Sequence, residues 1–277
     1  MSWLRDPMGR LRRRAEREGP AEVFALLRVG LVLLVWTEWG RDLQLFRDLT
    51  PHGLALSLTF WTSTTLLFLG AFSRVASAAT ALLMLWMYFG EGHHLGRHDW
   101  VHHHSWVIMS TTALLAFAPV ERWWSVDAWR AVRAGRPLAR EAPCWVLDLI
   151  GFQLSNVYFW GAWDKTYPGF LSGARLQHHF HALFWGSDAP GAWFGPTMLV
   201  LAVLTVALEY ALAIAPWIAR VRTPALLAGV ALHASFYLLL PVGTFSAAMV
   251  LLYLAWLPPE DVRAFLRGDR PLPSVPP

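Results

Sequence analysis

The sequence predicts an all-α, polytopic membrane protein: a helical bundle of about eight transmembrane helices with both termini in the cytoplasm. Hydrophobic residues make up 56% of the 277 residues and charged residues only 15%, whereas charged residues are about 25% of an average soluble domain. The apolar residues gather in runs whose lengths are close to the roughly 20 residues that a helix needs to span a bilayer. Most arginines lie at the ends of these runs, where they orient a membrane protein in the bilayer. The net charge of +4 is explained in this way, and nucleic acid is excluded as a partner.

Eight apolar runs define the predicted transmembrane helices. They cover residues 21–39, 54–71, 75–91, 104–119, 144–163, 196–217, 224–240 and 243–257. Their short connections favour one bundle over two domains. We therefore predict a basic cytoplasmic segment at 1–20, a transmembrane domain at 21–260 and a cytoplasmic tail at 261–277.

The positive charges predict the orientation of this bundle. Of the 23 lysines and arginines, 17 fall in one alternating set of ends and loops, five fall in the other set, and Arg28 lies inside the first run. Positive residues are enriched on the cytoplasmic side of membrane proteins. We therefore expect loops 92–103 and 164–195 to face outward from a bacterial-type inner (plasma) membrane, with any active side extracytoplasmic.

Histidine is concentrated in three places. Ten of the eleven histidines are His93, His94, His98, His102, His103, His104, His178, His179, His181 and His233. On a helix, His94, His98 and His102 would share one face, and imidazoles spaced four residues apart can bind one metal ion. His178, His179, His181 and His233 could supply further ligands, so one hypothesis is a histidine-ligated, di-iron-like membrane oxidoreductase. The alternative is that these histidines simply occupy the membrane interface.

Lys165 is the only lysine of the chain and ends an aromatic apolar run. A lysine that is partly removed from water can act as a base, although a lysine at a helix end can also simply extend to the interface. Tyr158, Trp160, Trp163 and Tyr167 surround it in sequence and could line a pocket for a quinone or an acyl chain.

Two opposite charges fall inside the apolar runs. Arg28 lies in the first run and Glu209 in the sixth. An unpaired charge in the membrane costs at least about 2.5 kcal/mol. We therefore predict a structural Arg28–Glu209 pair, with Asp148 as the alternative partner of Arg28.

Four segments together resemble a known membrane family. These segments are YFWGAWDKTYPGFLSG around Lys165, WVHHHSWVIMSTTALLAF around His104, the late Glu209 and His233 pattern, and ALLRVGLVLLV around Arg28. In order and spacing they resemble the HTTM (horizontally transferred transmembrane) domain family, which is related to the membrane part of the vitamin K-dependent gamma-carboxylase. His104, Ser105 and Trp106 match the family's His-Ser-aromatic sequence, and His103 stands where the carboxylase has asparagine.

The resemblance implies a lyase- or oxidoreductase-type enzyme. In the carboxylase, a lysine deprotonates reduced vitamin K, and oxygen then converts the quinol into a strong base and finally an epoxide. The resemblance implies that Lys165 is this base and that His104 is its partner, with His103 beside them and Trp106 at the substrate. It further implies a reduced, vitamin K- or menaquinol-like quinone as cosubstrate, a small lipid-soluble substrate, and a peptide or protein as a further substrate.

The chain departs from the family in two ways. Residues after 260 do not supply the carboxylase's large lumenal domain, so we expect the quinol chemistry rather than protein carboxylation to be retained. The extra histidines favour the metal hypothesis. A third hypothesis is a non-catalytic membrane partner in export, maturation or immunity.

Overall fold

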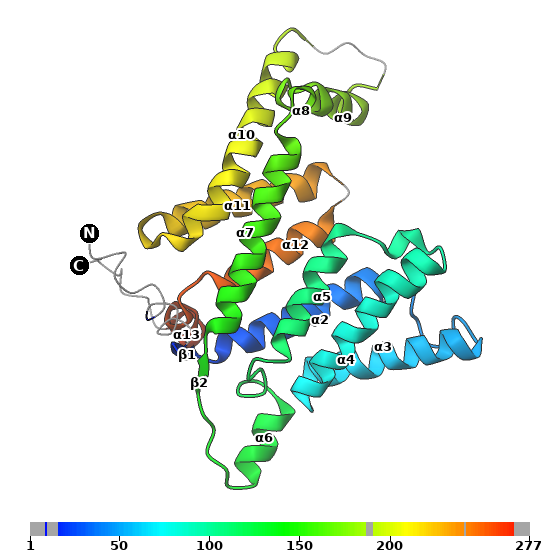
Figure 1. Ribbon diagram of the computed structural model, residues 1–277, viewed down its shortest axis with the longest axis vertical. Coiled ribbons are helices and arrows are strands. Elements are labelled where there is room, and N and C mark those ends of the chain that lie inside the picture. Colours follow the sequence, from blue (N-terminus) through cyan, green and yellow to red (C-terminus); the bar gives the residue numbers. More distant parts are fainter. Residues whose placement is uncertain (1–8, 10–15, 187–190, 241, 269–277) are drawn as a thin grey trace. The chain divides into compact units, whose positions relative to one another are not determined.

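The computed structural model describes residues 9, 16–186, 191–240 and 242–268, except for the side chain of His103 (Figure 1). The predicted all-α class is confirmed, and helices occupy all eight predicted positions. They are α2 (Glu22–Trp39), α3 (Pro51–Leu69), α4 (Ser73–Trp86), α5 (His103–Leu115), α7 (Trp145–Lys165), α10 (Phe194–Ile214), α11 (Ala219–Leu239) and α12 (Gly243–Leu252).

Shorter elements complete the described chain. The helices among them are the π-helix η2 (Met87–His94), the 3₁₀ turns η3 (His98–Trp100), η4 (Ala215–Trp217) and η5 (Tyr253–Ala255), and the α-helices α6 (Val126–Arg133), α8 (Pro168–Leu171), α9 (Ala174–Phe184) and α13 (Pro259–Arg267). Two strands, β1 (Glu18–Pro20) and β2 (Glu141–Pro143), pair antiparallel with Gly19 opposite Ala142.

The number of membrane spans stays a prediction. In the described part of the chain, only the helix Phe194–Trp217 is long and apolar enough to cross a membrane, and Gly243–Ala255 is a shorter apolar helix. The α5 helix has 13 residues, which at about 1.5 Å per residue is shorter than the hydrocarbon core. Helix length alone therefore does not establish the eight spans or the sides of the termini.

The chain divides into two compact units. The first contains Met1–Gly151 and Tyr237–Pro277, and the second contains Phe152–Phe236. In the first unit, α2 packs against α3, α5 and α12, and α4 packs between α3 and α5. In the second unit, Ala162 of α7, Phe170 of α8, and Ala202 and Val206 of α10 form a small apolar cluster.

Local sequence determines where α3 begins and ends. Thr50 precedes the helix with extended backbone and accepts a hydrogen bond from the Gly53 N–H, while Pro51 occupies the first turn. Both features are typical of helix N-termini. Gly70 ends the helix at a φ of +66°, a left-handed conformation that glycine adopts without steric cost.

An arginine near the C-terminus connects the two ends of the first unit. Arg263 on α13 donates to both carboxylate oxygens of Glu22 at 2.7 and 3.0 Å, and to Glu141 on β2 at 2.8 Å. The hydrogen bonds with Glu22 raise the pKa of the Arg263 guanidinium, which therefore stays charged. The Glu22 side chain is 2% exposed, so Arg263 takes the place of water as the partner of this carboxylate.

We expect Arg263→Met to lower the free energy of unfolding by about 3 kcal/mol, because it leaves a buried carboxylate without its main partner. Arg267→Met is the matched control. Arg267 lies 4.0 Å from the same carboxylate but is 47% exposed, so its loss should cost less than about 1 kcal/mol. Unfolding of the purified protein in mild detergent measures both values, and equal losses would contradict the prediction.

Candidate functional site

Lys165, the predicted base, is held by a carboxylate of the same unit. Its Nζ lies 3.0 Å from both Glu209 oxygens and 3.0 Å from the Gly161 carbonyl oxygen one helical turn earlier. An ammonium group has three N–H donors, and these three acceptors match them. The Glu209 side chain is 7% exposed and that of Lys165 is 30% exposed. The pair therefore combines a buried carboxylate with an amine that is still partly accessible.

Aromatic side chains accompany this pair on α7 and α10. The rings of Phe159 and Trp163 are stacked with centroids 6.5 Å apart, and the Tyr210 hydroxyl lies 3.0 Å from the Thr166 hydroxyl. Trp160 and Trp163 are 59% and 61% exposed. Tyr167, which is 40% exposed, precedes α8. Trp160, Trp163 and Tyr167 therefore present aromatic surface close to Lys165 in the chain.

Tyr158, the fourth predicted substrate residue, lies in the interior instead. It is 3% exposed, and its hydroxyl lies 2.7 Å from Nε2 of His233, which is 1% exposed. A predicted pocket residue and a predicted metal ligand are thus bonded to each other. This contact satisfies two polar groups inside an apolar environment, as buried polar groups generally require.

Arg28 and Glu209, the predicted pair, each bond to another group within their own unit. Glu209 bonds to Lys165, whereas Arg28 donates to the carbonyl oxygens of Leu67, Phe68 and Trp124 at 2.7, 2.6 and 2.5 Å. Asp148, the alternative partner, accepts none of these bonds. The last carbonyls of a helix lack partners within that helix, and Arg28 supplies donors to those at the end of α3.

His104, the predicted partner histidine, is held by a glutamate that the sequence analysis did not single out. Its Nε2 lies 2.7 Å from the Glu38 carboxylate at the end of α2, and both side chains are 14% exposed. The Thr244 hydroxyl of α12 bonds to the same carboxylate. The neighbouring His102 ring stacks on the His104 ring at 5.0 Å with an interplanar angle of 12°. Three helices thus fix this histidine.

The remaining residues of this segment have different surroundings. The side chain of His103 lies outside the described residues. Trp106 is 49% exposed, and its ring centroid lies 6.2 Å from those of Tyr88 and Phe89. The His93 ring lies 5.3 Å from Tyr88. Trp106 therefore belongs to an aromatic group in the first unit.

The predicted metal ligands are dispersed over several elements. His94 lies on η2, His98 in η3 and His102 just before α5, while His178, His179 and His181 lie on α9. Because η2 ends at His94, the predicted continuous helical face is not formed. Among the described residues, no group of three or more histidine, cysteine or acidic side chains is placed to hold a metal. The metal site stays a prediction, and metal analysis of the purified protein tests it.

A second buried carboxylate, Glu91, was also missed. It is 1% exposed on the π-helix η2, where the His52 ring, the Trp86 indole N–H and the Arg97 Nε lie 2.5, 3.2 and 3.5 Å from its oxygens. A π-turn inside a helix frequently occurs at a functional site. In the sequence, Glu38 and Glu91 could have been recognised as acidic residues that lie within predicted apolar runs.

Comparison with known proteins identifies the family. No curated protein and no solved structure matches the chain. The model of the HTTM domain matches residues 43–260, which include His104, Lys165, Glu209 and His233. The match covers most of the chain and confirms the family suggested by the sequence. The chain therefore belongs to the HTTM domain family of membrane proteins related to the gamma-carboxylase.

Proposed function

We propose that this protein is a membrane enzyme in which Lys165 removes a proton from a quinol-type, lipid-soluble substrate. The observation that carries the proposal is the position of the lone lysine, whose amine is held by the buried carboxylate of Glu209 and remains partly accessible. Active sites often combine burial with a specific charged partner in this way. The family match supports the membrane setting, and the substrate class comes from the resemblance.

Glu209 gives the lysine a way to act as a base. A charged ammonium has no lone pair and cannot accept a proton, so Lys165 must first give one up. Glu209, 3.0 Å away, is the acceptor within reach, and in an environment of low dielectric the neutral amine–carboxylic acid pair competes with the ion pair. The neutral amine then takes the proton of the substrate hydroxyl, which leaves an ammonium beside the substrate oxyanion.

The surroundings of Lys165 suit a flat, apolar substrate. Trp160 and Trp163 expose aromatic faces on the same end of α7, and aromatic side chains prefer offset or edge-on contact with other rings. Gly161 keeps the space beside the amine open, because a Cβ there would lie 3.6 Å from Nζ. A reduced quinone would supply an acidic hydroxyl on an oxidisable ring.

His104 enters the proposal through the resemblance. In the neutral imidazole, the bond to the Glu38 carboxylate favours the tautomer with the proton on Nε2, which leaves Nδ1 as the acceptor nitrogen. A carboxylate in this position orients the imidazole and stabilises its charged form. We propose that His104 stabilises charge on the substrate, with Glu38 as its positioning residue.

Turnover of a reduced quinone tests the proposal. We expect the purified protein in nanodiscs to consume menaquinol in the presence of oxygen, with product formation followed by liquid chromatography and mass spectrometry. Lys165→Arg should lower the rate at least about 100-fold, because arginine keeps the positive charge beside Glu209 but does not release its proton. Arg220→Lys, the reverse exchange at an exposed position of α11, is the control.

The outcomes separate the parts of the proposal. Undiminished turnover in Lys165→Arg would overturn the assignment of the base. Failure of the wild-type protein to consume any reduced quinone, while it remains folded, would overturn the substrate class.

A further inference from the structure

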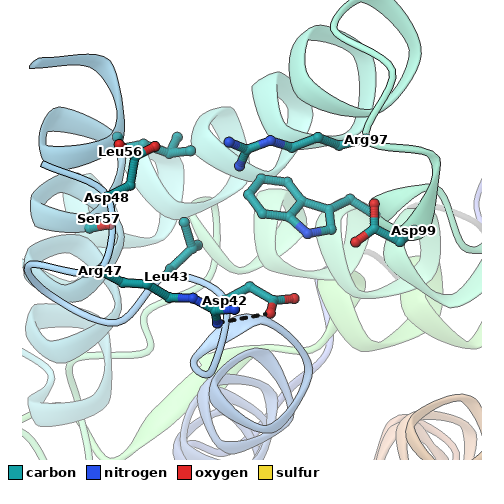
Figure 2. A pocket seen from close by; sticks show the side chains of 10 residues that line it. Asp42, Leu43, Arg47, Asp48, Leu56, Ser57, Arg97 and Asp99 are labelled. Carbon is teal, nitrogen blue, oxygen red and sulfur yellow. Dashed lines mark hydrogen bonds and ion pairs between the residues drawn. The ribbon is translucent and has the colours of Figure 1, made fainter. Parts of the chain in front are cut away.

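A charged cavity in the first unit is not used by the proposed reaction. It has a volume of about 340 Å³, comparable with the smaller ligand pockets of proteins. The lining comes from the loop after α2, the first turns of α3 and the loop around η3 (Figure 2). It comprises Asp42, Leu43, Arg47, Asp48, Gly53, Leu56, Ser57, Arg97, Asp99 and Trp100.

Hydrogen bonds fix the lining on the α3 side. The Asp48 carboxylate accepts hydrogen bonds from the N–H and hydroxyl of Thr50 at 3.0 and 2.7 Å. Thr50 in turn caps α3, and the Trp61 indole donates to the Leu43 carbonyl at 2.7 Å. Leu43, Leu56 and Trp100 are each buried. The cavity therefore has a fixed apolar base beneath charged side chains.

Arg97 is positioned on this base by the Trp100 ring and by an ion pair with the buried Glu91. Its guanidinium carbon lies 4.8 Å from the centre of the Trp100 ring, and its Nε faces the buried Glu91 at 3.5 Å. The side chain extends across the cavity toward Asp48 (Figure 2). Within the described residues, the guanidinium donates no hydrogen bond. A planar arginine fork held in this way matches the geometry of a carboxylate or a phosphate.

Negative charge is available at the same cavity. Asp99 lies two residues from Arg97 and makes no hydrogen bond or ion pair within the described part of the chain. The hydrogen bonds from Thr50 lower the pKa of Asp48, which therefore stays ionised at neutral pH. Arg47 is occupied differently, since it donates to the Arg41 carbonyl at 2.8 Å and lies 3.4 Å from Asp42. The cavity thus presents a guanidinium whose two Nη groups make no hydrogen bond within the described residues, together with the unpaired carboxylate of Asp99.

We propose that this cavity binds a zwitterionic group in which an ammonium and a carboxylate or phosphate are joined by a short linker. Arg97 receives the anion, and Asp99, which makes no hydrogen bond or ion pair within the described residues, receives the ammonium. An ion with one charge would satisfy only one side and leave like charges next to it, whereas a zwitterion satisfies both. This chemistry is shared by the ethanolamine phospholipid headgroup and by free amino acids.

The loop that borders the cavity favours the lipid as the source. Leu45, Phe46 and Leu49 are 43%, 69% and 71% exposed, although Leu45 and Phe46 lie between the lining residues Asp42 and Asp48 and Leu49 directly follows Asp48. Phe46 has a φ of +67°, which is energetically unfavourable for a large side chain. An apolar loop tip beside a charged cavity is suited to an interface where a headgroup and acyl chains are both within reach.

Binding of defined probes tests this site. We expect calorimetry on the full chain in detergent to show that glycerophosphoethanolamine or glycine binds at least tenfold more tightly than glycerol 3-phosphate or ethanolamine, which carry only one type of charge. Nanodiscs made with phosphatidylethanolamine or phosphatidylglycerol distinguish the source. Selective retention of the ethanolamine lipid identifies the headgroup, and binding of glycine without that retention identifies a free amino acid.

Variants connect the binding to the named side chains. Arg97→Lys, which removes the fork but keeps the charge, and Asp99→Asn should each weaken zwitterion binding at least tenfold. Arg41→Gln in the same loop, outside the lining, should bind like the wild type. Asp99 has no partner to lose among the residues that the structure describes, so Asp99→Asn keeps the test valid if Arg97→Lys unfolds. Equal binding of single-charged and zwitterionic probes, or wild-type binding by Asp99→Asn, would overturn the proposal.

Discussion

Lys165→Met is expected to lower the free energy of unfolding by about 3 kcal/mol, because it removes the partner of a buried carboxylate. Glu209 is 5% exposed, and both of its oxygens bond to the lysine amine. Unfolding in mild detergent, followed by tryptophan fluorescence, measures the loss.

The double variant Lys165→Met with Glu209→Leu provides the control for this prediction. Replacing both members of a buried ion pair with apolar residues of similar volume is often neutral, so the double variant should recover most of the stability lost in the single variant. A double variant as unstable as the sum of both single changes would contradict the assignment of the pair. Because Lys165 is the only lysine, labelling with an amine-reactive probe followed by peptide mass spectrometry reports it apart from the N-terminal amine. Glu209→Gln removes the carboxylate that holds the amine and should make this labelling faster at a fixed pH.

The stability and turnover measurements separate structure from chemistry. Lys165→Arg keeps a cation beside Glu209 and should retain much of the stability that Lys165→Met loses. If turnover disappears in Lys165→Arg while the protein stays folded, the loss is due to the missing base. If both properties fall together, the pair acts mainly in packing.

The long helices could be predicted because each is an apolar run with polar ends. The predicted run 21–39 became α2 (Glu22–Trp39), and 144–163 became α7 (Trp145–Lys165). The same criterion missed α8 and α9 in the predicted loop 164–195, since these short helices have no long apolar run. It also missed the pairing of β1 with β2, because three-residue strands carry no recognisable alternation.

The site was only half predictable. Lys165 and His104 stand out by rarity and by resemblance, but their partners, Glu209 and Glu38, lie 44 and 66 residues away in the sequence. Hydrophobic periodicity indicates which face of a helix is apolar, but it does not determine how two neighbouring helices are rotated or shifted along their axes relative to each other. Partner choice for a charged residue depends on both. For this reason the sequence indicated that Arg28 needs a partner but not that backbone carbonyls of its own unit would supply it.

We expect Arg28→Met to lower the free energy of unfolding by about 3 kcal/mol or more, since it leaves three carbonyls without their donor in the interior. Arg28 is fully buried, and its guanidinium joins α2 to the end of α3 and to Trp124 before α6. The turn between α3 and α4 is built around the Arg28 guanidinium. At Gly70 a Cβ atom would lie 2.6 Å from the Arg28 Nη1, so only glycine fits beside it.

The carboxylate of Asp127 strengthens the same junction between α3, α4 and α6. Asp127 on α6 accepts hydrogen bonds from the backbone N–H groups of Phe72 and Ser73 at 3.1 and 3.0 Å, at the start of α4. Arg28→Lys should recover only part of the stability, because a single ammonium cannot span carbonyls on both sides of the turn. Arg74→Met, the control, removes a side chain that is 58% exposed and lies 3.7 Å from Glu121, and should cost less than about 1 kcal/mol. If Arg28→Met were no more destabilised than this control, the carbonyl contacts would not account for a charge inside the first apolar helix, and a functional role for Arg28 would be the better explanation.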